Sequence, residues 1–122
     1  MTKKILLIED NNDWRNIFKS KLAENGHSVL TAEDGQSGLK LAEKEKPDLL
    51  ILDLMMPILD GKSFLNAIKK IKTLRNIPVI IVSNIADPEI KIGSEGVNDY
   101  LIKTNTSPEQ LLKSVNRALE KT

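Results

Sequence analysis

The sequence contains no cysteine, few aromatic residues and almost no net charge. The absence of cysteine excludes disulfide bonds and thiolate metal sites. Lys and Arg together number 18 against 17 Asp and Glu, so the net charge is +1, and no strong field attracts nucleic acid or an anionic membrane. We therefore expect no direct nucleic-acid binding, and we expect any partner to be recognised through a local surface.

Long apolar runs are also missing. The first apolar segment, 5–8, is far too short for a signal peptide or a membrane span, and it ends directly in Glu9 and Asp10. We expect no membrane insertion and, because cysteine is absent, a cytoplasmic location. A length of 122 residues with 40% hydrophobic content suits one domain over 1–122 with one compact core.

Five short segments rich in Ile, Val and Leu have the composition of strands that are buried on both faces. They are 5–8, 28–32, 49–53, 79–83 and 100–102. Segments with helical periodicity lie between them. The first carries Trp14, Ile17, Phe18 and Leu22 before Gly26, the second ends before Pro47, and the third carries Phe64, Leu65, Ile68 and Ile71.

The last two predicted helices differ in how well they are marked. The residues at 87–96 are interrupted by Gly93, which favours a short or irregular fourth helix. Ser107, Pro108 and Gln110 supply a helix cap, a first-turn proline and the reciprocal capping residue. Strands that alternate with helices in this way predict an α/β fold with a doubly wound five-stranded parallel sheet and five helices.

Charged and polar residues follow four of the predicted strands, where parallel sheets bind ligands. They are Glu9 and Asp10 after the first strand, Asp53 and Ser83 closing the third and fourth, and Lys103 after the fifth. Two carboxylates about 4 Å apart repel by roughly 4 kcal/mol at an effective dielectric constant of 20, so the acids need a cation or shifted pKa values. Oxygen ligands without His or Cys favour Mg²⁺. Each acid alone is more typical of a solvated loop or a helix cap, and the hypothesis depends on their coincidence.

The same residues carry a family resemblance. The acid pair in "IEDNN", the aspartate in "LLILDLMMPILDG", the hydroxyl in "VIIVSN" and the lysine in "NDYLIKT", in this order, resemble the receiver domain of two-component response regulators over essentially the whole chain. The resemblance implies a flavodoxin-like receiver fold with strand order 2-1-3-4-5.

The resemblance also implies a role for each of these residues. Asp53 would accept a phosphoryl group from a histidine kinase or a histidine phosphotransfer protein, with Lys103 paired to the phosphoryl oxygens. Mg²⁺ would be held by Asp10, Asp53 and the backbone carbonyl of Met55, with Glu9 acting through a metal-bound water. Ser83 and Tyr100 would switch a surface that binds an unknown downstream protein.

Further expectations concern activity and assembly. We expect no enzymatic activity beyond the chain's own phosphoryl transfer and self-dephosphorylation. The self-dephosphorylation should be slow, because the apolar Met55 and Ile85 would flank the approach of water. We expect a monomer or a weak dimer. No output domain follows within the sequence, which suits a stand-alone regulator or a receiver fragment of a longer one.

Three other functions compete with this interpretation. Asn84 and Thr104 stand where the family usually has a very small residue and a proline, which leaves open a binding module that does not respond to phosphorylation. A dehalogenase-like phosphatase generally needs a second acid where Met55 stands. A flavodoxin-like nucleotide carrier needs a phosphate-binding loop rich in Gly, Ser or Thr, which "EDNNDW" does not provide.

Overall fold

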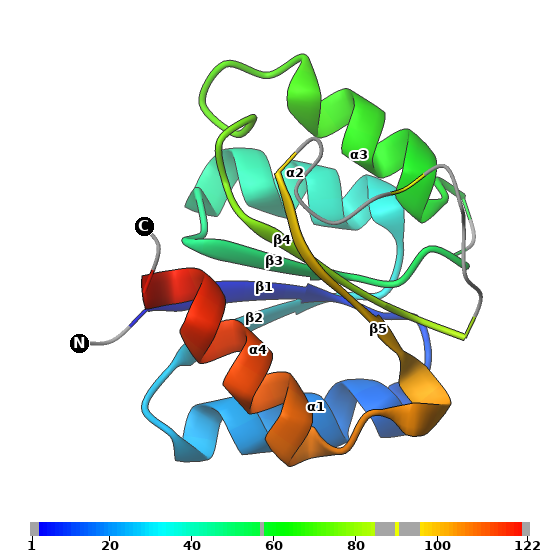
Figure 1. The fold of residues 1–122 in the computed structure, drawn as a ribbon. Coiled ribbons are helices and arrows are strands. Elements are labelled where there is room, and N and C mark those ends of the chain that lie inside the picture. The colour runs from blue at the N-terminus through cyan, green and yellow to red at the C-terminus, as the bar shows by residue number, and fades with distance from the viewer. Residues whose placement is uncertain (1–2, 57, 85–89, 91–95, 121–122) are drawn as a thin grey trace.

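A five-stranded parallel sheet forms the centre of the molecule (Figure 1). This computed structural model describes residues 3–56, 58–84, 90 and 96–120. The strands are β1 (Lys4–Ile8), β2 (Ser28–Ala32), β3 (Leu49–Leu52), β4 (Val79–Ser83) and β5 (Val97–Ile102). Their order is β2-β1-β3-β4-β5, as predicted.

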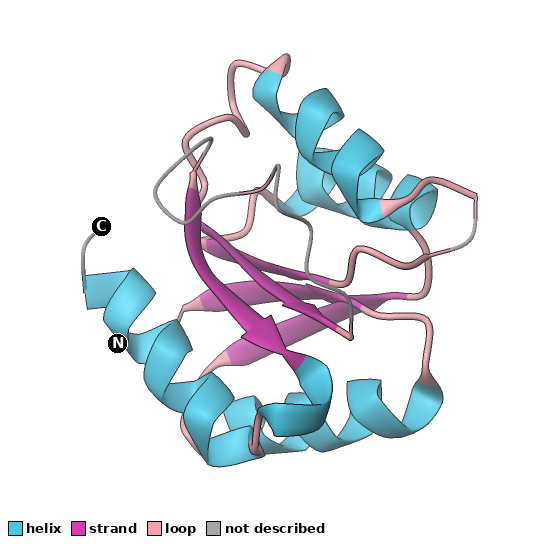
Figure 2. Ribbon diagram, turned by 45° about the vertical axis from the view of Figure 1, so that its right-hand side comes forward, coloured by secondary structure: helices cyan, strands magenta, loops and turns pink. Residues whose placement is uncertain are grey.

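Four α-helices cover the two faces of the sheet in the part of the chain that the structure describes. They are α1 (Asn12–Glu24), α2 (Gly35–Glu45), α3 (Gly61–Lys69) and α4 (Pro108–Glu120). Helices α1 and α4 lie on one face, and α2 and α3 lie on the other (Figures 1 and 2). The short helix predicted at 87–96 falls mostly on 87–89 and 91–95, which lie outside the described residues. Among the described helices, none is long and apolar enough to span a membrane.

Alternating side chains of the central strands build two separate cores. In β1, Ile5 and Leu7 pack with α1 and α4, whereas Leu6 and Ile8 pack with the buried residues of α2 and α3. Strands β3 and β4 divide their side chains between the two faces in the same way. Successive side chains of a strand point to opposite faces, so a continuous apolar run is what a doubly covered sheet requires.

The prediction that all five strands are buried on both faces was wrong for β2 and β5. Ser28 is exposed and Val29, Leu30 and Thr31 are half-buried, and most of β5 is also half-buried. These two strands lie at the edges of the sheet, where each has a single neighbouring strand. Apolar composition predicts a strand, but its place in the sheet decides how much of it is covered.

The predicted start of the last helix and the glycine stop after the first helix were confirmed, whereas α3 ends at Lys69, before the predicted Ile71. The Gln110 amide donates to the Ser107 hydroxyl at 3.1 Å, and the Ser107 amide donates to the Gln110 side-chain oxygen at 2.7 Å. This reciprocal pair satisfies amide groups that the first turn of α4 leaves unpaired. After α1, Gly26 has a φ of +88°, which is a conformation that glycine adopts without steric cost.

A glycine also brings the start of α3 against the end of β3. The Gly61 amide donates to the Leu54 carbonyl at 3.0 Å, and a Cβ at position 61 would lie 2.6 Å from the Leu54 Cα and 2.7 Å from the Asp53 carbonyl oxygen. Backbone atoms cannot yield as a flexible side chain can, so any larger residue at position 61 must displace the backbone.

We expect Gly61→Ala to lower the free energy of unfolding by about 1–3 kcal/mol, because the added methyl group displaces backbone. Gly38→Ala is the matched control, since the added Cβ would meet the Ile8 side chain, whose Cδ1 lies 2.7 Å away. Alanine is also about 1 kcal/mol more favourable than glycine within a helix. Urea unfolding of both variants measures the difference. Equal losses in the two variants would contradict this account.

Candidate functional site

Strand register brings Glu9 and Asp53 side by side. Ile8 pairs with Leu52 in the parallel ladder between β1 and β3, and the Asp53 amide continues the ladder by donating to the Ile8 carbonyl at 3.2 Å. Each acid is the first residue after its strand. The two carboxylates therefore leave the same edge of the sheet, as the sequence predicted.

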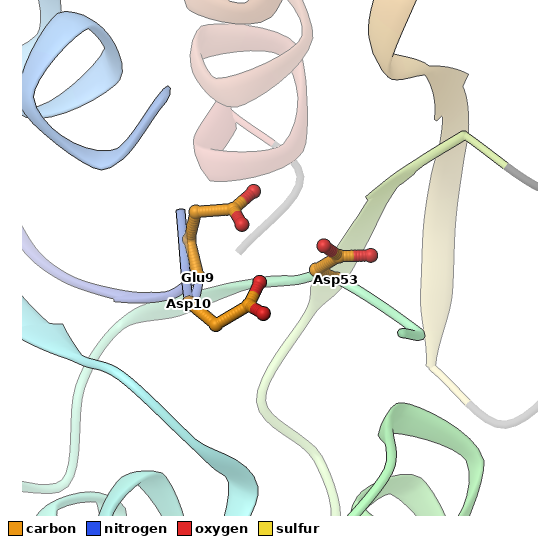
Figure 3. Close-up of side chains that lie close together, drawn as sticks. All are labelled: Glu9, Asp10 and Asp53. Carbon is orange, nitrogen blue, oxygen red and sulfur yellow. The ribbon is translucent and has the colours of Figure 1, made fainter. Parts of the chain in front are cut away.

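Three carboxylates meet at this edge, namely those of Glu9, Asp10 and Asp53 (Figure 3). One oxygen from each lies within 4.8 Å of the others. Glu9 and Asp53 are 2% and 5% exposed, whereas Asp10 is exposed to solvent. The group consists of oxygen donors alone and is open on the Asp10 side, which is compatible with a hard divalent cation such as Mg²⁺.

Lys103 places its ammonium between two of these acids. Its Nζ lies 2.6 Å from Glu9 Oε1 and 2.9 Å from Asp53 Oδ2, and the residue is 5% exposed. Burial alone would lower the pKa of Lys103, but the hydrogen bonds to Glu9 and Asp53 raise it above its ordinary value. The lysine therefore stays charged and neutralises part of the acid cluster.

The pKa of Glu9 is also raised, and for an acid this shift disfavours the charged form. Burial, helped by the Asp53 carboxylate, raises the pKa of Glu9, although hydrogen bonds from Lys103 and from the Asn11 amide oppose this shift. One ammonium cannot neutralise three carboxylates. The pocket thus keeps an excess of negative charge, which a further cation would relieve.

Of the remaining predicted residues, the structure shows Met55 in contact with Asp53. The Met55 amide donates to Asp53 Oδ1 at 3.1 Å. Ser83 ends β4, the strand next to β3, and its fully buried hydroxyl has no hydrogen-bond partner among the described residues. Tyr100 lies in β5, half-buried against the core under α2 and α3. Ile85, the second residue expected to restrict water, lies outside the described residues.

Two contacts of the site were not predicted from the sequence. Lys103 lies 5.8 Å from the ring centre of Trp14, which the helical pattern placed only as a packing residue. Arg15 donates to the Glu9 carbonyl oxygen at 2.9 Å and forms an ion pair with Glu33 at 3.4 Å. A basic residue in the first turn of the helix after an acid pair only weakly indicates a contact with those acids. No sequence pattern could have shown that Arg15 binds the Glu9 carbonyl oxygen and Glu33.

The loop after β3 presents an isoleucine in an unusual conformation. Ile58 has a φ of +71° and is 76% exposed. A β-branched side chain rarely adopts a positive φ, because its Cβ crowds the backbone. The backbone of the next residue, Leu59, approaches Gly35 so closely that a Cβ at position 35 would meet the Leu59 carbonyl oxygen.

Doubly wound parallel sheets bind their ligands at the carboxyl ends of the strands, and in this α/β protein three acids and a buried lysine gather at that edge. Residues 5–116 match the family model of the response regulator receiver domain. The chain belongs to this family, whose members act in two-component signalling.

Individual relatives agree with this assignment. The chain is 36% identical to the protein PilH of Pseudomonas aeruginosa over 118 residues, which cover 95% of this chain and 97% of that protein. It is 38% identical to the probable transcriptional regulator ycf27 of Galdieria sulphuraria, covering 98% of this chain and 47% of the relative. Its structure resembles the chemotaxis response regulator CheY4 of Vibrio cholerae with a TM-score of 0.86 and 29% identity, covering 97% and 99% of the two chains. The chain spans about half the length of many curated relatives that it matches.

We expect Ile58→Asn to raise the free energy of unfolding by about 1 kcal/mol, because asparagine tolerates a positive φ and the exposed isoleucine contributes little burial. Ile58→Val is the matched control, since valine keeps the branched Cβ and so keeps the strain. Thermal or urea unfolding measures both. A loss of stability in Ile58→Asn would mean that the isoleucine makes contacts that outweigh its backbone strain.

Proposed function

We propose that Asp53 accepts a phosphoryl group from a histidine kinase or a histidine phosphotransfer protein, and that the resulting aspartyl phosphate switches a partner-binding surface. One observation carries the proposal: Asp53 lies in a cluster of three acids within 4.8 Å, with the Lys103 ammonium 2.9 Å from its carboxylate. A structural ion pair needs one acid and one base. Two further acids beside it suit a site that handles phosphate and a cation together.

Mg²⁺ fits this site by the chemistry of its donors. Asp10, Asp53 and the backbone carbonyl of Met55 would hold the ion, and Glu9 would act through a metal-bound water. The exposed side of Asp10 leaves room for the waters that Mg²⁺ retains. When bound, the ion offsets negative charge on the transferring phosphoryl group.

In the transfer itself, an Asp53 carboxylate oxygen attacks the phosphorus in line with the bond to the donor. The new oxygen–phosphorus bond forms as the phosphorus–nitrogen bond of the donor histidine breaks, and the imidazole leaves with the electron pair. Lys103 moves from Asp53 Oδ2 to a phosphoryl oxygen, which its flexible stem permits. The transfer needs no proton from Asp53, because its carboxylate attacks in the ionised form.

The switch depends on Ser83 and Tyr100. The Ser83 hydroxyl, buried and without a hydrogen-bond partner among the described residues, would donate to a phosphoryl oxygen and draw the end of β4 toward Asp53. Tyr100 lies on the neighbouring strand, opposite Ile81 in the register, and would turn inward as that strand end moves. A local charge would thereby change a surface that a downstream protein recognises.

Assembly and output belong to the same proposal. Some relatives are transcriptional regulators about twice as long, whereas PilH and CheY4 have almost the length of this chain. We propose that this receiver acts in the cytoplasm by docking a target protein, as a monomer or a weak dimer. Apart from its own phosphoryl transfer and slow dephosphorylation, we propose no enzymatic activity.

We expect incubation with acetyl phosphate and Mg²⁺ to add one phosphoryl group to the protein, as measured by intact-protein mass spectrometry. The adduct should be absent in Asp53→Asn and should require Mg²⁺, so excess EDTA prevents it. Asp60→Asn is the matched control, because Asp60 caps α3 through the Ser63 amide at 2.8 Å and asparagine keeps this cap. No adduct in the parent protein would favour a phosphorylation-independent binding module, and steady release of phosphate from an ester would favour a phosphatase.

We expect the aspartyl phosphate to decay slowly, because the apolar Met55 stands two residues beyond Asp53 and gives water no hydrogen-bond partner. Met55 is 56% exposed, so Met55→Glu and Met55→Asn should fold normally and accelerate decay several-fold. The measurement follows loss of the adduct after the phosphodonor is removed. Rapid decay in the parent, or unchanged decay in both variants, would count against this role of Met55.

A further inference from the structure

Lys103 belongs to a closed cycle of contacts that includes the first turn of α1. Glu9 Oε1 lies 2.6 Å from Lys103 Nζ, and this ammonium lies 5.8 Å from the ring centre of Trp14. The Trp14 amide donates to Asn11 Oδ1 at 3.0 Å, and the Asn11 amide donates to Glu9 Oε2 at 3.0 Å. This cycle of contacts begins and ends at Glu9, so the helix cap, the acid and the ammonium hold one another in place.

Trp14 suits the ammonium for a physical reason. The face of an indole ring attracts a cation within about 6 Å of its centre, and tryptophan does so more strongly than the other aromatic residues. Unlike a carboxylate, the ring takes no N–H group of the lysine as a hydrogen-bond donor. The ammonium is therefore confined while its N–H groups stay available to carboxylate or phosphoryl oxygens.

The Trp14 ring is itself held in position. Its centre lies 5.3 Å from that of Phe18, one turn further along α1, with an angle of 43° between the planes. Phe18 is 1% exposed and belongs to the core between α1, α4 and the sheet. The aromatic pair thus anchors the ring to a rigid part of the fold, as a positioning group requires.

We propose that Trp14 is a positioning residue for phosphoryl transfer, which holds the Lys103 ammonium against the Glu9 and Asp53 carboxylates where the phosphoryl oxygens arrive. This inference rests on the proposed function of Asp53. Trp14 acts through Lys103, whose four-carbon stem leaves the ammonium free to rotate if nothing confines it. The sequence contains one tryptophan, so the tryptophan fluorescence of the protein comes from this residue alone.

The test is a double-mutant cycle on the rate of adduct formation with saturating acetyl phosphate and Mg²⁺. We expect Trp14→Leu to slow the reaction about two- to fivefold, and Trp14→Phe to slow it less, because phenylalanine keeps an aromatic face. In the Lys103→Met background, Trp14→Leu should change the residual rate less than twofold. Equal slowing in both backgrounds would show a general structural effect and would overturn the proposal.

A second cycle on the same variants measures the contact without any phosphodonor. We expect Trp14→Leu to lower the equilibrium constant for folding about two- to fivefold more in the parent than in Lys103→Met, by urea unfolding. Strictly additive effects would overturn the proposal. Ile17→Ala, at an exposed position of the same helix, should show no coupling to Lys103 in either cycle.

These outcomes separate the two proposals. Absence of any adduct in the parent protein would overturn the proposed function, whatever the unfolding cycle shows. Normal adduct formation with additive unfolding, or with equal slowing in both backgrounds, would overturn the role of Trp14 alone. Addition of Mg²⁺ and beryllofluoride should also change the Trp14 emission in the parent and leave it unchanged in Lys103→Met.

Discussion

The site depends on a buried ammonium shared by two carboxylates. Lys103 contacts Glu9 at 2.6 Å and Asp53 at 2.9 Å, with all three residues at most 5% exposed. Removing such groups from water costs several kcal/mol for each ion, and they persist because each one satisfies another. The arrangement also leaves the pocket acidic, since Asp10 adds a third carboxylate. The excess negative charge makes the pocket compatible with a further cation.

The sheet makes this arrangement possible by register. Parallel strands end at the same edge, so residues that follow β1 and β3 become neighbours although 44 positions separate Glu9 from Asp53. The ladder continues one residue past the paired strands through the Asp53 amide. Lys103 leaves the same edge of the sheet, in the 3-10 turn Lys103–Asn105 that follows the parallel strand β5, two strands away from β3. The acids are thus rigidly placed, whereas the lysine reaches them through a long side chain.

Most of the fold could be predicted from the sequence because its signals are local. The capping pair of Ser107 and Gln110 marked the start of α4 to the residue, and the apolar runs marked all five strands. Two element boundaries were wrong, because β5 begins at Val97 and α3 ends at Lys69, and the other errors concern burial. The prediction treated β2 as a central strand because of Val29, Leu30 and Ala32, yet β2 lies at an edge and also contains the polar Ser28 and Thr31. Ile17 shares the helical spacing of Phe18 and Leu22 but is 48% exposed, since the apolar pattern of α1 is wider than the surface that it covers.

The candidate site was predictable in its members but not in its contacts. The order of acid pair, aspartate, hydroxyl and lysine along the chain was enough to identify the candidate site residues, which are Glu9, Asp10, Asp53, Ser83 and Lys103. Strand ends can be predicted from the sequence, and the carboxyl ends of parallel strands lie at the same edge of the sheet. That Lys103 lies between two acids and beside Trp14 was decided by tertiary structure. A flexible side chain has many rotamers, and the packing of helices on the sheet selects one of them. The sequence by itself thus determined which groups gather at the sheet edge, and the tertiary structure decided which of them touch.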